Sequence, residues 1–257
     1  MNRPITGRVV ELFSGIQGEG LRVGERHLFL RLAGCAFGCA YCDQPEARAR
    51  PETAAIERSA GARDFRRVSN PLAPAALTRL IRSLCAGRTG LHKVLAVTGG
   101  EPLHQVEFLC ALLPRVRRRR LPAMLETNGV LPDALRALRG LIDIISMDLK
   151  LRSTTGRPMP MAAHARFLRE AVRSNAEVHV KVVVGSATTS KEMRRAARLV
   201  ARVSRSVPVV LQPVTLIRRG GPEPPPPDSL LALQETASAV LHDVRVIPQT
   251  HKLIGQR

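Results

Sequence analysis

The chain has 257 residues, 44% of them hydrophobic and 3% aromatic, and it carries a formal net charge of +19. This length and apolar fraction fit one α/β domain with a packed core and exclude an intrinsically disordered chain. The sequence shows no signal-peptide run and no stretch near the roughly 20 apolar residues that span a bilayer, and its crowded cysteines do not resemble a secreted disulfide framework, so we expect a reduced, cytoplasmic protein without membrane contact.

Short segments rich in Val, Ile and Leu alternate along the chain with amphipathic segments. Continuous apolar strands separated by helices indicate a parallel sheet built from βα units. We therefore predict an α/β fold, an incomplete (β/α) barrel of TIM-like type, with functional residues at the C-terminal ends of the strands. The predicted strands are Val9–Phe13, His27–Leu32, Val94–Thr98, Ala123–Glu126, Ile142–Asp148, Val178–Val184, Val209–Gln212 and Val244–Pro248, and the predicted helices cover about 73–87, 104–113, 131–139, 161–175, 189–206 and 228–242.

Two segments break this alternation. Residues 45–72 are rich in Ala, Arg and Glu with little apolar periodicity, and we interpret them as an insertion. Residues 219–228 read RGGPEPPPPD and predict a proline-rich loop, since proline fits neither a helix interior nor an inner strand. We find no internal repeat and no clear boundary, so a single domain is expected over residues 1–257.

The basic excess, with a pI of about 11.4, has two interpretations. Lysine and arginine can bind nucleic-acid phosphates, or they can fill solvated helix faces. Arginine is scattered over nearly every segment, with one run at Arg117–Arg120, and tryptophan is absent, so side chains that could stack on bases are scarce. We favour the solvated surface and expect no nucleic-acid partner; a metal-stabilised nucleic-acid-binding module remains the alternative from another functional class.

The segment GCAFGCAYCDQ places Cys35, Cys39 and Cys42 in the spacing C-x3-C-x2-C. Three thiolates can hold a 4Fe-4S cluster and leave one iron open to chelate S-adenosylmethionine (SAM), whose cleavage by the reduced cluster yields a 5′-deoxyadenosyl radical. Zinc would normally need a fourth protein ligand, and His27 and His104 lack the spacing for it. The pattern therefore predicts a radical SAM cluster, with a zinc site and buried, chemically inert cysteines as the alternatives.

Three other residues near or outside this motif are interpreted separately. Cys85 and Cys110 lie in helical apolar patterns and are expected to pack in the core. Tyr41 precedes the last cysteine of the motif, where an aromatic ring could contact the adenine of SAM and hold it beside the cluster.

Beyond the cysteines, the chain resembles the 7-carboxy-7-deazaguanine synthases, radical SAM enzymes of the queuosine and 7-deazapurine pathway. The matching segments occur in family order from about residue 9 to 252: ELFSGIQGEG, FLRLAGCAFGCAYCD, VTGGEP, LETNG, HVKVVV, VLQPV and VRVIPQTHK. The resemblance implies a lyase that converts 6-carboxy-5,6,7,8-tetrahydropterin to 7-carboxy-7-deazaguanine with loss of ammonia. It also implies a homodimer and an electron donor such as a flavodoxin or ferredoxin.

The resemblance also implies which residues bind the pterin substrate. Glu19 lies in a polar loop and is an acceptor suited to pterin N–H groups, while Arg31 can hold the substrate carboxylate through two hydrogen bonds. No catalytic side chain is expected beyond the cofactor chemistry. The implied substrate-binding residues are Ile16, Gln17, Gly18, Glu19, Arg31, Thr98 and His251.

The SAM contacts implied by the resemblance follow several strands. The glycines after Thr98 let the backbone approach a ligand closely. Lys181 fits either a ligand role or a buried ion pair. The implied SAM-binding residues are Tyr41, Cys42, Asp43, Gly100, Glu126, Thr127, Ser146, Asp148, Lys150, Gln212 and Pro213.

Some positions depart from the family pattern. Gln44 stands where relatives commonly carry Thr or Ser, a position that supports a Mg²⁺ ion near the substrate. Its amide oxygen is a hard ligand, but the geometry would differ, so the Mg²⁺ requirement stays open. The runner-up function is an enzyme that places a glycyl radical on a partner protein, which shares the cysteine spacing and the Asp148-x-Lys150 pattern but needs no pterin pocket.

Overall fold

The structure is a computed structural model that describes residues 4–87, 90–118, 120–216 and 221–256. Within these ranges, the strands form a single ten-stranded sheet in the order β10-β9-β8-β7-β6-β5-β2-β1-β3-β4. The strands are β1 (Val9–Ile16), β2 (Arg26–Leu32), β3 (Thr53–Glu57), β4 (Phe65–Ser69), β5 (Val94–Gly99), β6 (Ala123–Thr127), β7 (Ile144–Asp148), β8 (Glu177–Val184), β9 (Val209–Pro213) and β10 (Val244–Val246).

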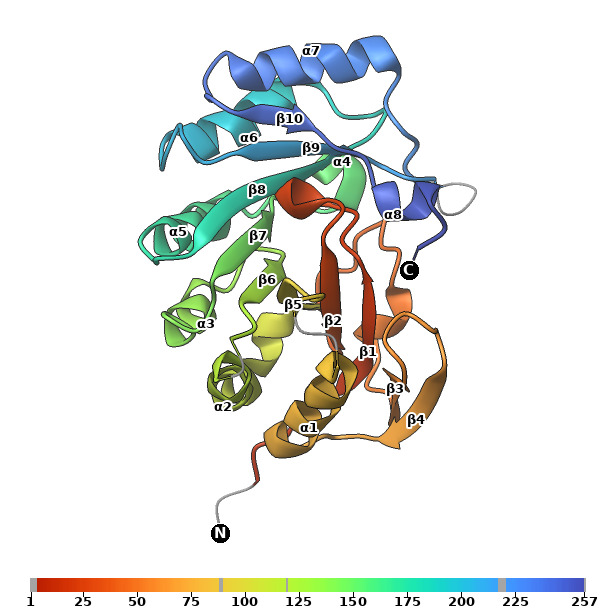
Figure 1. The fold of residues 1–257 in the computed structure, drawn as a ribbon. Helices are drawn as coiled ribbons and strands as arrows, with labels where there is room; N and C mark the ends of the chain where they lie inside the picture. Colours follow the sequence, from red (N-terminus) through yellow and green to blue (C-terminus); the bar gives the residue numbers. More distant parts are fainter. Residues whose placement is uncertain (1–3, 88–89, 119, 217–220, 257) are drawn as a thin grey trace.

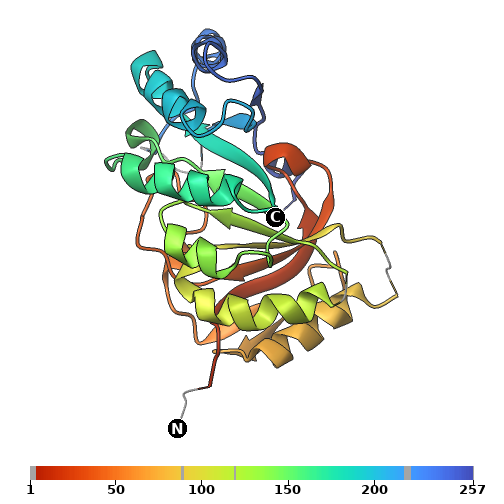
Figure 2. The ribbon, with the colours of Figure 1, turned by 90° about the vertical axis from the view of Figure 1, so that its left-hand side faces the viewer.

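Strand β2 and strands β5 to β10 are parallel, and β1 is antiparallel to β2. Strands β10 and β4 form the two ends of the sheet and do not pair with each other. The sheet curves, and the long helices α1, α2, α3, α5, α6 and α7 follow one another along its outer side (Figures 1 and 2). The predicted incomplete (β/α) barrel is therefore confirmed.

The long helices pack against the sheet and against one another through apolar faces. The helices are α1 (Pro74–Cys85), α2 (Val106–Arg117), α3 (Pro132–Ala137), α4 (Arg152–Thr155), α5 (Met161–Val172), α6 (Ser190–Ala201), α7 (Pro227–Ser238) and α8 (Thr250–Leu253). In α6, Met193, Ala196, Ala197 and Val200 are buried in the main core, which is the i, i+3, i+4, i+7 pattern of an amphipathic helix. The Thr189 hydroxyl caps the first turn by accepting from the Glu192 backbone N–H.

The eight predicted strands and six predicted helices all have counterparts, with ends that differ by a few residues. Helix α2 extends past the predicted end because Leu112, Leu113 and Val116 continue its buried face. The short helices α4 and α8 and the 3-10 turns η1 (Gly20–Arg22), η2 (Pro45–Arg48) and η3 (Pro102–Gln105) were not predicted, since so few residues carry no helical period. In the described residues no helix is long and apolar enough to cross a membrane.

The segment 45–72 contains strand structure that the sequence analysis did not predict. Strands β3 and β4 form an antiparallel hairpin, and β3 pairs in parallel with β1, so the hairpin extends the main sheet. In the edge strand β4, the consecutive residues Arg66 and Arg67 are both exposed. The strand therefore lacks the alternation of apolar and polar residues by which a half-buried strand is recognised in a sequence. The single-domain assignment stays a prediction. Residues 219 and 220 of the proline-rich loop and Arg119 of the arginine run lie outside the described residues.

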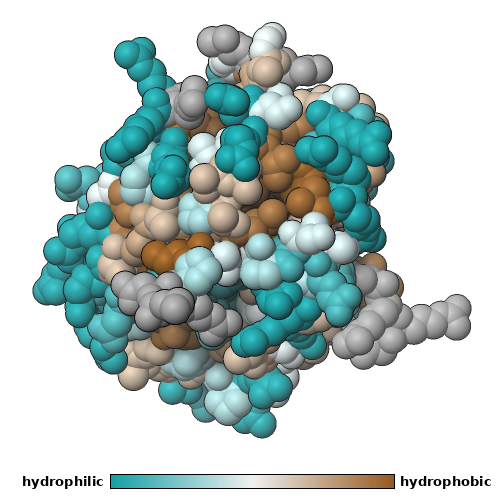
Figure 3. Space-filling model, turned by 90° about the horizontal axis from the view of Figure 1, so that it is seen from below, coloured by the Kyte–Doolittle hydropathy of each residue, from teal (hydrophilic) through white to brown (hydrophobic). Residues whose placement is uncertain are grey.

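The surface seen from below has hydrophilic side chains over most of its margin and apolar ones nearer its middle (Figure 3). Some large apolar side chains are exposed elsewhere too, among them Ile5 and Leu253. The hydrophilic surface is therefore not continuous on this side of the molecule.

Candidate active site

A cavity of about 200 Å³ lies where the C-terminal ends of the strands meet the loop after β2 and the C-terminal segment. Strand ends from β5, β6, β7 and β9 reach it, because parallel strands bring their C-terminal ends to one edge of the sheet. All of the predicted substrate and SAM residues line it except Pro213, which ends β9 outside the lining, and so do the predicted cluster cysteines and Gln44. Residues that line it without having been predicted include Phe13, Phe29, Phe37, Arg48, Asn128 and Gln249.

The three predicted cluster cysteines lie on one loop against this cavity, and none forms a disulfide. Two hydrogen bonds join the loop to residues outside the cysteine motif. Arg48 donates to the Cys39 carbonyl at 3.1 Å, and the Ala40 N–H donates to the Thr155 carbonyl at 3.3 Å. Burial raises the pKa of the Cys39 thiol, and the nearby Lys150 charge opposes this rise. A cation beside the loop favours the thiolate form that metal ligation requires.

The three sulfurs are not gathered as closely as three ligands of one zinc ion would be. The Sγ atoms of Cys35, Cys39 and Cys42 do not all lie within 4.8 Å of one another. A zinc ion about 2.3 Å from each sulfur would hold them about 3.8 Å apart. Cys85 and Cys110 pack against the main core away from the cavity, as expected. The residues present therefore fit a 4Fe-4S cluster held by three cysteines.

The glycine turn after β5 packs directly on the cysteine loop. A Cβ at Gly100 would lie 2.4 Å from the Gly34 carbonyl oxygen and 2.8 Å from the Cys35 Cβ, which no side chain tolerates. The Glu101 N–H also donates to the Gly34 carbonyl at 2.7 Å. The turn thus holds the start of the cysteine loop, in addition to the predicted approach to SAM.

Glu101 in this turn is a buried residue whose role the sequence analysis missed. Its carboxylate accepts from the Thr127 hydroxyl at 2.8 Å and from the Asn128 N–H at 2.8 Å. Burial raises its pKa, and these hydrogen bonds oppose the rise. Glu101 therefore joins the end of β5 to the end of β6, and Thr127, predicted to bind SAM, already donates its hydroxyl hydrogen within the protein.

Lys150 connects strand β7 to the cysteine loop. Its Nζ lies 2.7 Å from Asp148 Oδ2 and 2.7 Å from the Tyr41 hydroxyl oxygen, and 5.0 Å from the centre of the Tyr41 ring. Burial and the charge of Asp148 raise the pKa of Tyr41 well above its usual value. The phenol is thus neutral, and its ring lines the cavity.

Glu19 is held from two sides by residues far away in the sequence. Lys181 Nζ lies 2.5 Å from Glu19 Oε2, and Gln249 Nε2 donates to Oε1 at 2.6 Å. Burial alone would raise the pKa of Glu19, but the attraction and hydrogen bonds of Lys181, with that of Gln249, lower it to about 2. Glu19 is therefore a carboxylate at neutral pH, and the two interpretations of Lys181 resolve to a buried ion pair at the cavity wall.

Arg31 also forms an ion pair rather than standing alone. Its Nε lies 2.8 Å from Glu11 Oε1, and the exposed fractions of the two side chains are 12% and 1%. The guanidinium still lines the cavity. Because only Nε is used in this pair, the planar group keeps further N–H donors for a ligand in the cavity.

Two buried amides mark where a ligand could be recognised. Gln17 Nε2 donates to Glu126 Oε1 at 2.8 Å, which orients both side chains. The Gln212 Oε1 atom is buried at the cavity and has no hydrogen-bond partner among the described residues. A buried acceptor without a partner is costly, so a donor from a bound molecule is expected there.

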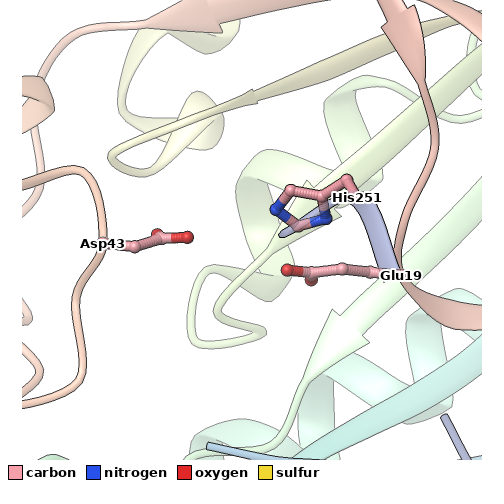
Figure 4. Close-up of side chains that lie close together, drawn as sticks. All are labelled: Glu19, Asp43 and His251. Carbon is pink, nitrogen blue, oxygen red and sulfur yellow. The ribbon is translucent and has the colours of Figure 1, made fainter. Parts of the chain in front are cut away.

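Glu19, Asp43 and His251 bring one ligand atom each within 4.8 Å of one another (Figure 4). Their positive neighbours already neutralise the carboxylates: Lys181 pairs with Glu19, and Lys252 Nζ lies 3.2 Å from Asp43 Oδ2. A divalent cation would compete with these two ammonium groups. Gln44 lines the same cavity, where its amide oxygen is the hard donor named for Mg²⁺ in the sequence analysis.

The family assignment comes from three comparisons. A model of the Radical SAM superfamily matches residues 30–200. A 7-carboxy-7-deazaguanine synthase of Geobacter sulfurreducens is 41% identical over 246 residues, covering 96% of each chain. The enzyme of the same name from Methanopyrus kandleri is 36% identical over 254 residues, covering 98% of this chain and 95% of the other.

A solved structure agrees at the level of the fold. The crystal structure of QueE from Escherichia coli matches with a TM-score of 0.58 at 20% identity, covering 95% of this chain and 93% of that one. The similarity to the two synthases extends over nearly the full length of each chain. The chain therefore belongs to the 7-carboxy-7-deazaguanine synthase family of radical SAM enzymes.

Proposed function

We propose that the protein is a radical SAM carbon–nitrogen lyase that converts 6-carboxy-5,6,7,8-tetrahydropterin to 7-carboxy-7-deazaguanine and ammonia, on the route to 7-cyano-7-deazaguanine and queuosine. The observation that carries the proposal is that one cavity holds both the cysteine loop and the Glu19–Lys181 pair. A radical source and a polar recognition site then face each other across a space the size of small molecules.

Cys35, Cys39 and Cys42 would hold the cluster, with SAM against the Gly99–Gly100 turn, Tyr41 and the ends of β6, β7 and β9. When bound, the cluster and SAM would supply a 5′-deoxyadenosyl radical for the removal of a hydrogen at C6 of the pterin. The side chains orient the molecules and exclude water. Gln212 supports this placement, because its buried Oε1 needs a donor such as the adenine amino group.

The pterin would lie between Glu19 and Arg31. The ionised Glu19 accepts hydrogen bonds from the 2-amino and ring N–H groups, and Lys181 and Gln249 keep the carboxylate in place. Arg31 grips the substrate carboxylate while Glu11 holds its Nε. These two contacts at opposite ends of the substrate would fix C6 relative to the radical, since a small misplacement of the reacting atoms is costly.

We further propose that Mg²⁺ is not required by this chain. Lys252 forms an ion pair with Asp43, and Lys181 forms one with Glu19. The negative charges of the two carboxylates are therefore already balanced, which weakens the binding of a divalent cation. The protein would act as a cytoplasmic homodimer that receives electrons from a flavodoxin or ferredoxin, as expected from its family. Light scattering should then give about twice the chain mass of 28.0 kDa.

The reaction is tested with protein reconstituted anaerobically with iron and sulfide. It is incubated with SAM, dithionite and 6-carboxy-5,6,7,8-tetrahydropterin, and the products are followed by absorbance and mass spectrometry. We expect a deazapurine chromophore together with ammonia, with SAM used catalytically. Cleavage of SAM without a deazapurine would show that the chain has another substrate.

A further inference from the structure

A second hollow of about 880 Å³ lies on the other side of the cysteine loop from the active-site cavity. Cys35 and Arg48 line both spaces, so only the loop separates the hollow from the proposed cluster. The rest of its lining comes from the segment before β1, the residues around η2, and the start of α2. None of these other residues is used in the proposed binding of SAM or the pterin.

The hollow carries a positive charge that the protein leaves uncompensated. Arg8, Arg48 and Arg50 line it, and Glu107 is the single carboxylate among its described lining residues. In the described part of the chain, none of the three arginines forms an ion pair. Arg8 and Arg48 donate to backbone carbonyls, of Pro51 at 3.1 Å and Cys39 at 3.1 Å, and both Arg48 and Arg50 are exposed.

We propose that this hollow is the docking surface for an acidic one-electron carrier protein, which reduces the cluster through the Cys35 side of the loop. The proposal rests on the proposed function, because a radical SAM cluster must receive an electron from outside. The active-site cavity is unsuitable as the entry, since SAM and substrate would fill it. The hollow offers the opposite approach to the same cysteine, next to a surface with solvent access.

The charge determines the class of partner. Complementary charges steer association and raise its rate at low ionic strength. Three arginines against one glutamate favour a negatively charged partner. A nucleic acid is less suited to this hollow because its described lining offers few stacking faces: Phe108 is buried with 2% exposure, and His104 is the one exposed aromatic ring.

The test compares two double variants with equal changes in charge. In Arg8→Glu/Arg50→Glu the reversal is placed in the hollow; in Arg194→Glu/Arg195→Glu it is placed on exposed positions of α6, away from it. Reduction of the reconstituted cluster by an acidic, photoreduced flavodoxin is followed by stopped-flow absorbance at low and high salt. Turnover driven by excess dithionite is measured for each protein.

We expect the hollow variant to lose about tenfold or more in the second-order rate of reduction by flavodoxin at low salt. The loss should shrink at high salt, as electrostatic steering is screened. The α6 variant should stay within about threefold of the unmodified protein. Unchanged reduction of the hollow variant, or an equal loss in both variants, would overturn the proposal.

Turnover driven by dithionite distinguishes a failure of the docking proposal from a failure of the proposed reaction. A normal deazapurine yield with dithionite in the hollow variant shows that the fold, cluster and active site are intact, so a slow reaction with flavodoxin reports docking. If no protein forms a deazapurine with dithionite, the proposed reaction fails while the reduction rates still test the docking surface. A single Arg50→Glu variant, at an exposed position where misfolding is not expected, should show part of the same loss.

Discussion

Gln249, close to the C-terminus, donates a 2.6 Å hydrogen bond from its Nε2 to Oε1 of Glu19, 230 positions earlier. The Thr250 N–H adds a 2.9 Å bond to the carbonyl of Gly18 in the same loop. Gly18 must be a glycine there, because a Cβ would lie 2.2 Å from Nδ1 of His251. The two ends of the chain therefore build one wall of the cavity together.

The Lys181–Glu19 pair predicts an effect of pH on substrate binding. The pKa of Glu19 is about 2 largely because Lys181 outweighs burial, so in Lys181→Met burial would dominate and raise the pKa above the ordinary 4.5. Below that raised pKa, Glu19 would be protonated and a poor acceptor for the pterin. We expect kcat/KM of this variant to fall as the pH is lowered through the neutral range. The unmodified protein should show no such fall (no acidic limb) caused by Glu19 in its plot of kcat/KM against pH.

Lys252→Met is the matched control for this pH profile. It removes an ammonium group from Asp43 but leaves the partners of Glu19 in place. Its profile should lack the new limb. A limb of equal size in both variants would mean that Glu19 is not the group being titrated.

Cluster content should depend on three of the five cysteines. Cys35→Ala, Cys39→Ala or Cys42→Ala removes one of the three protein ligands, and we expect loss of the cluster absorbance and of bound iron after reconstitution. Cys85→Ala and Cys110→Ala truncate side chains that pack against the main core, and they should keep full iron content. Normal iron in Cys39→Ala would refute the assignment of ligands.

The sequence predicts the parallel strands well because their cause is local. Strands such as β5 and β9 are continuous apolar runs that can be buried only inside a sheet covered on both faces. The hairpin of β3 and β4 could not be predicted in this way. Its arginines face solvent, and its place in the sheet is decided by pairing with β1, which no local pattern reports.

The site residues show the same division. The motif segments identify which side chains reach the cavity, because each follows a strand end or lies on the cysteine loop. They do not identify the partners. Lys181 meets Glu19 across 162 positions and Glu101 meets Thr127 across 26, and these pairings depend on which strands become neighbours in the folded sheet.

Mg²⁺ removal should leave turnover nearly unchanged. Asp43 is paired with Lys252, and Gln44 brings an amide instead of a hydroxyl group to the cysteine loop. We expect activity within about twofold when EDTA is added after reconstitution, because ammonium groups already balance the carboxylates. The variant Gln44→Thr/Lys252→Gln releases Asp43 and should become responsive to Mg²⁺. A large loss with EDTA in the unmodified protein, restored by Mg²⁺, would contradict the proposal.

The buried His179 predicts a loss of stability in mild acid. Burial lowers its pKa from 6.5 to about 4, and neither ring nitrogen has a hydrogen-bond partner among the described residues. Between these two values the unfolded chain binds a proton that the folded chain does not. The free energy of unfolding should therefore fall as the pH is lowered through this window, by about 2 kcal/mol at pH 5 from this residue alone.

This loss is measured by denaturant unfolding at pH 7.5 and pH 5 under anaerobic conditions. His179→Leu should show a smaller difference between the two pH values than the unmodified protein. His242→Gln, at an exposed position, should leave the difference unchanged and controls for acid effects on the cluster. Equal pH dependence in His179→Leu and the unmodified protein would exclude the burial of a neutral His179 as the cause.

Arg31 gives the sharpest test of substrate orientation. The pterin carries a carboxylate, and a closed site that buried it unpaired would pay several kcal/mol, about the cost of an uncompensated polar group. Arg31→Lys keeps the charge but loses the planar two-point grip, so KM should rise and kcat should fall through misplacement of C6. Arg31→Ala should lose about 2–5 kcal/mol in kcat/KM. The measurement is steady-state turnover with the cluster absorbance of each variant.

Because Arg31 is paired with the buried Glu11, Arg31→Ala also removes one charged partner of that carboxylate and can destabilise the fold. The double variant Arg31→Gln/Glu11→Gln removes both charges and separates stability from binding. It should unfold at a denaturant concentration near that of the unmodified protein and still lose the substrate. Cluster content and uncoupled cleavage of SAM should survive in all three variants, because neither step uses the pterin carboxylate. Normal pterin turnover in Arg31→Ala would show that the guanidinium serves only its pair with Glu11.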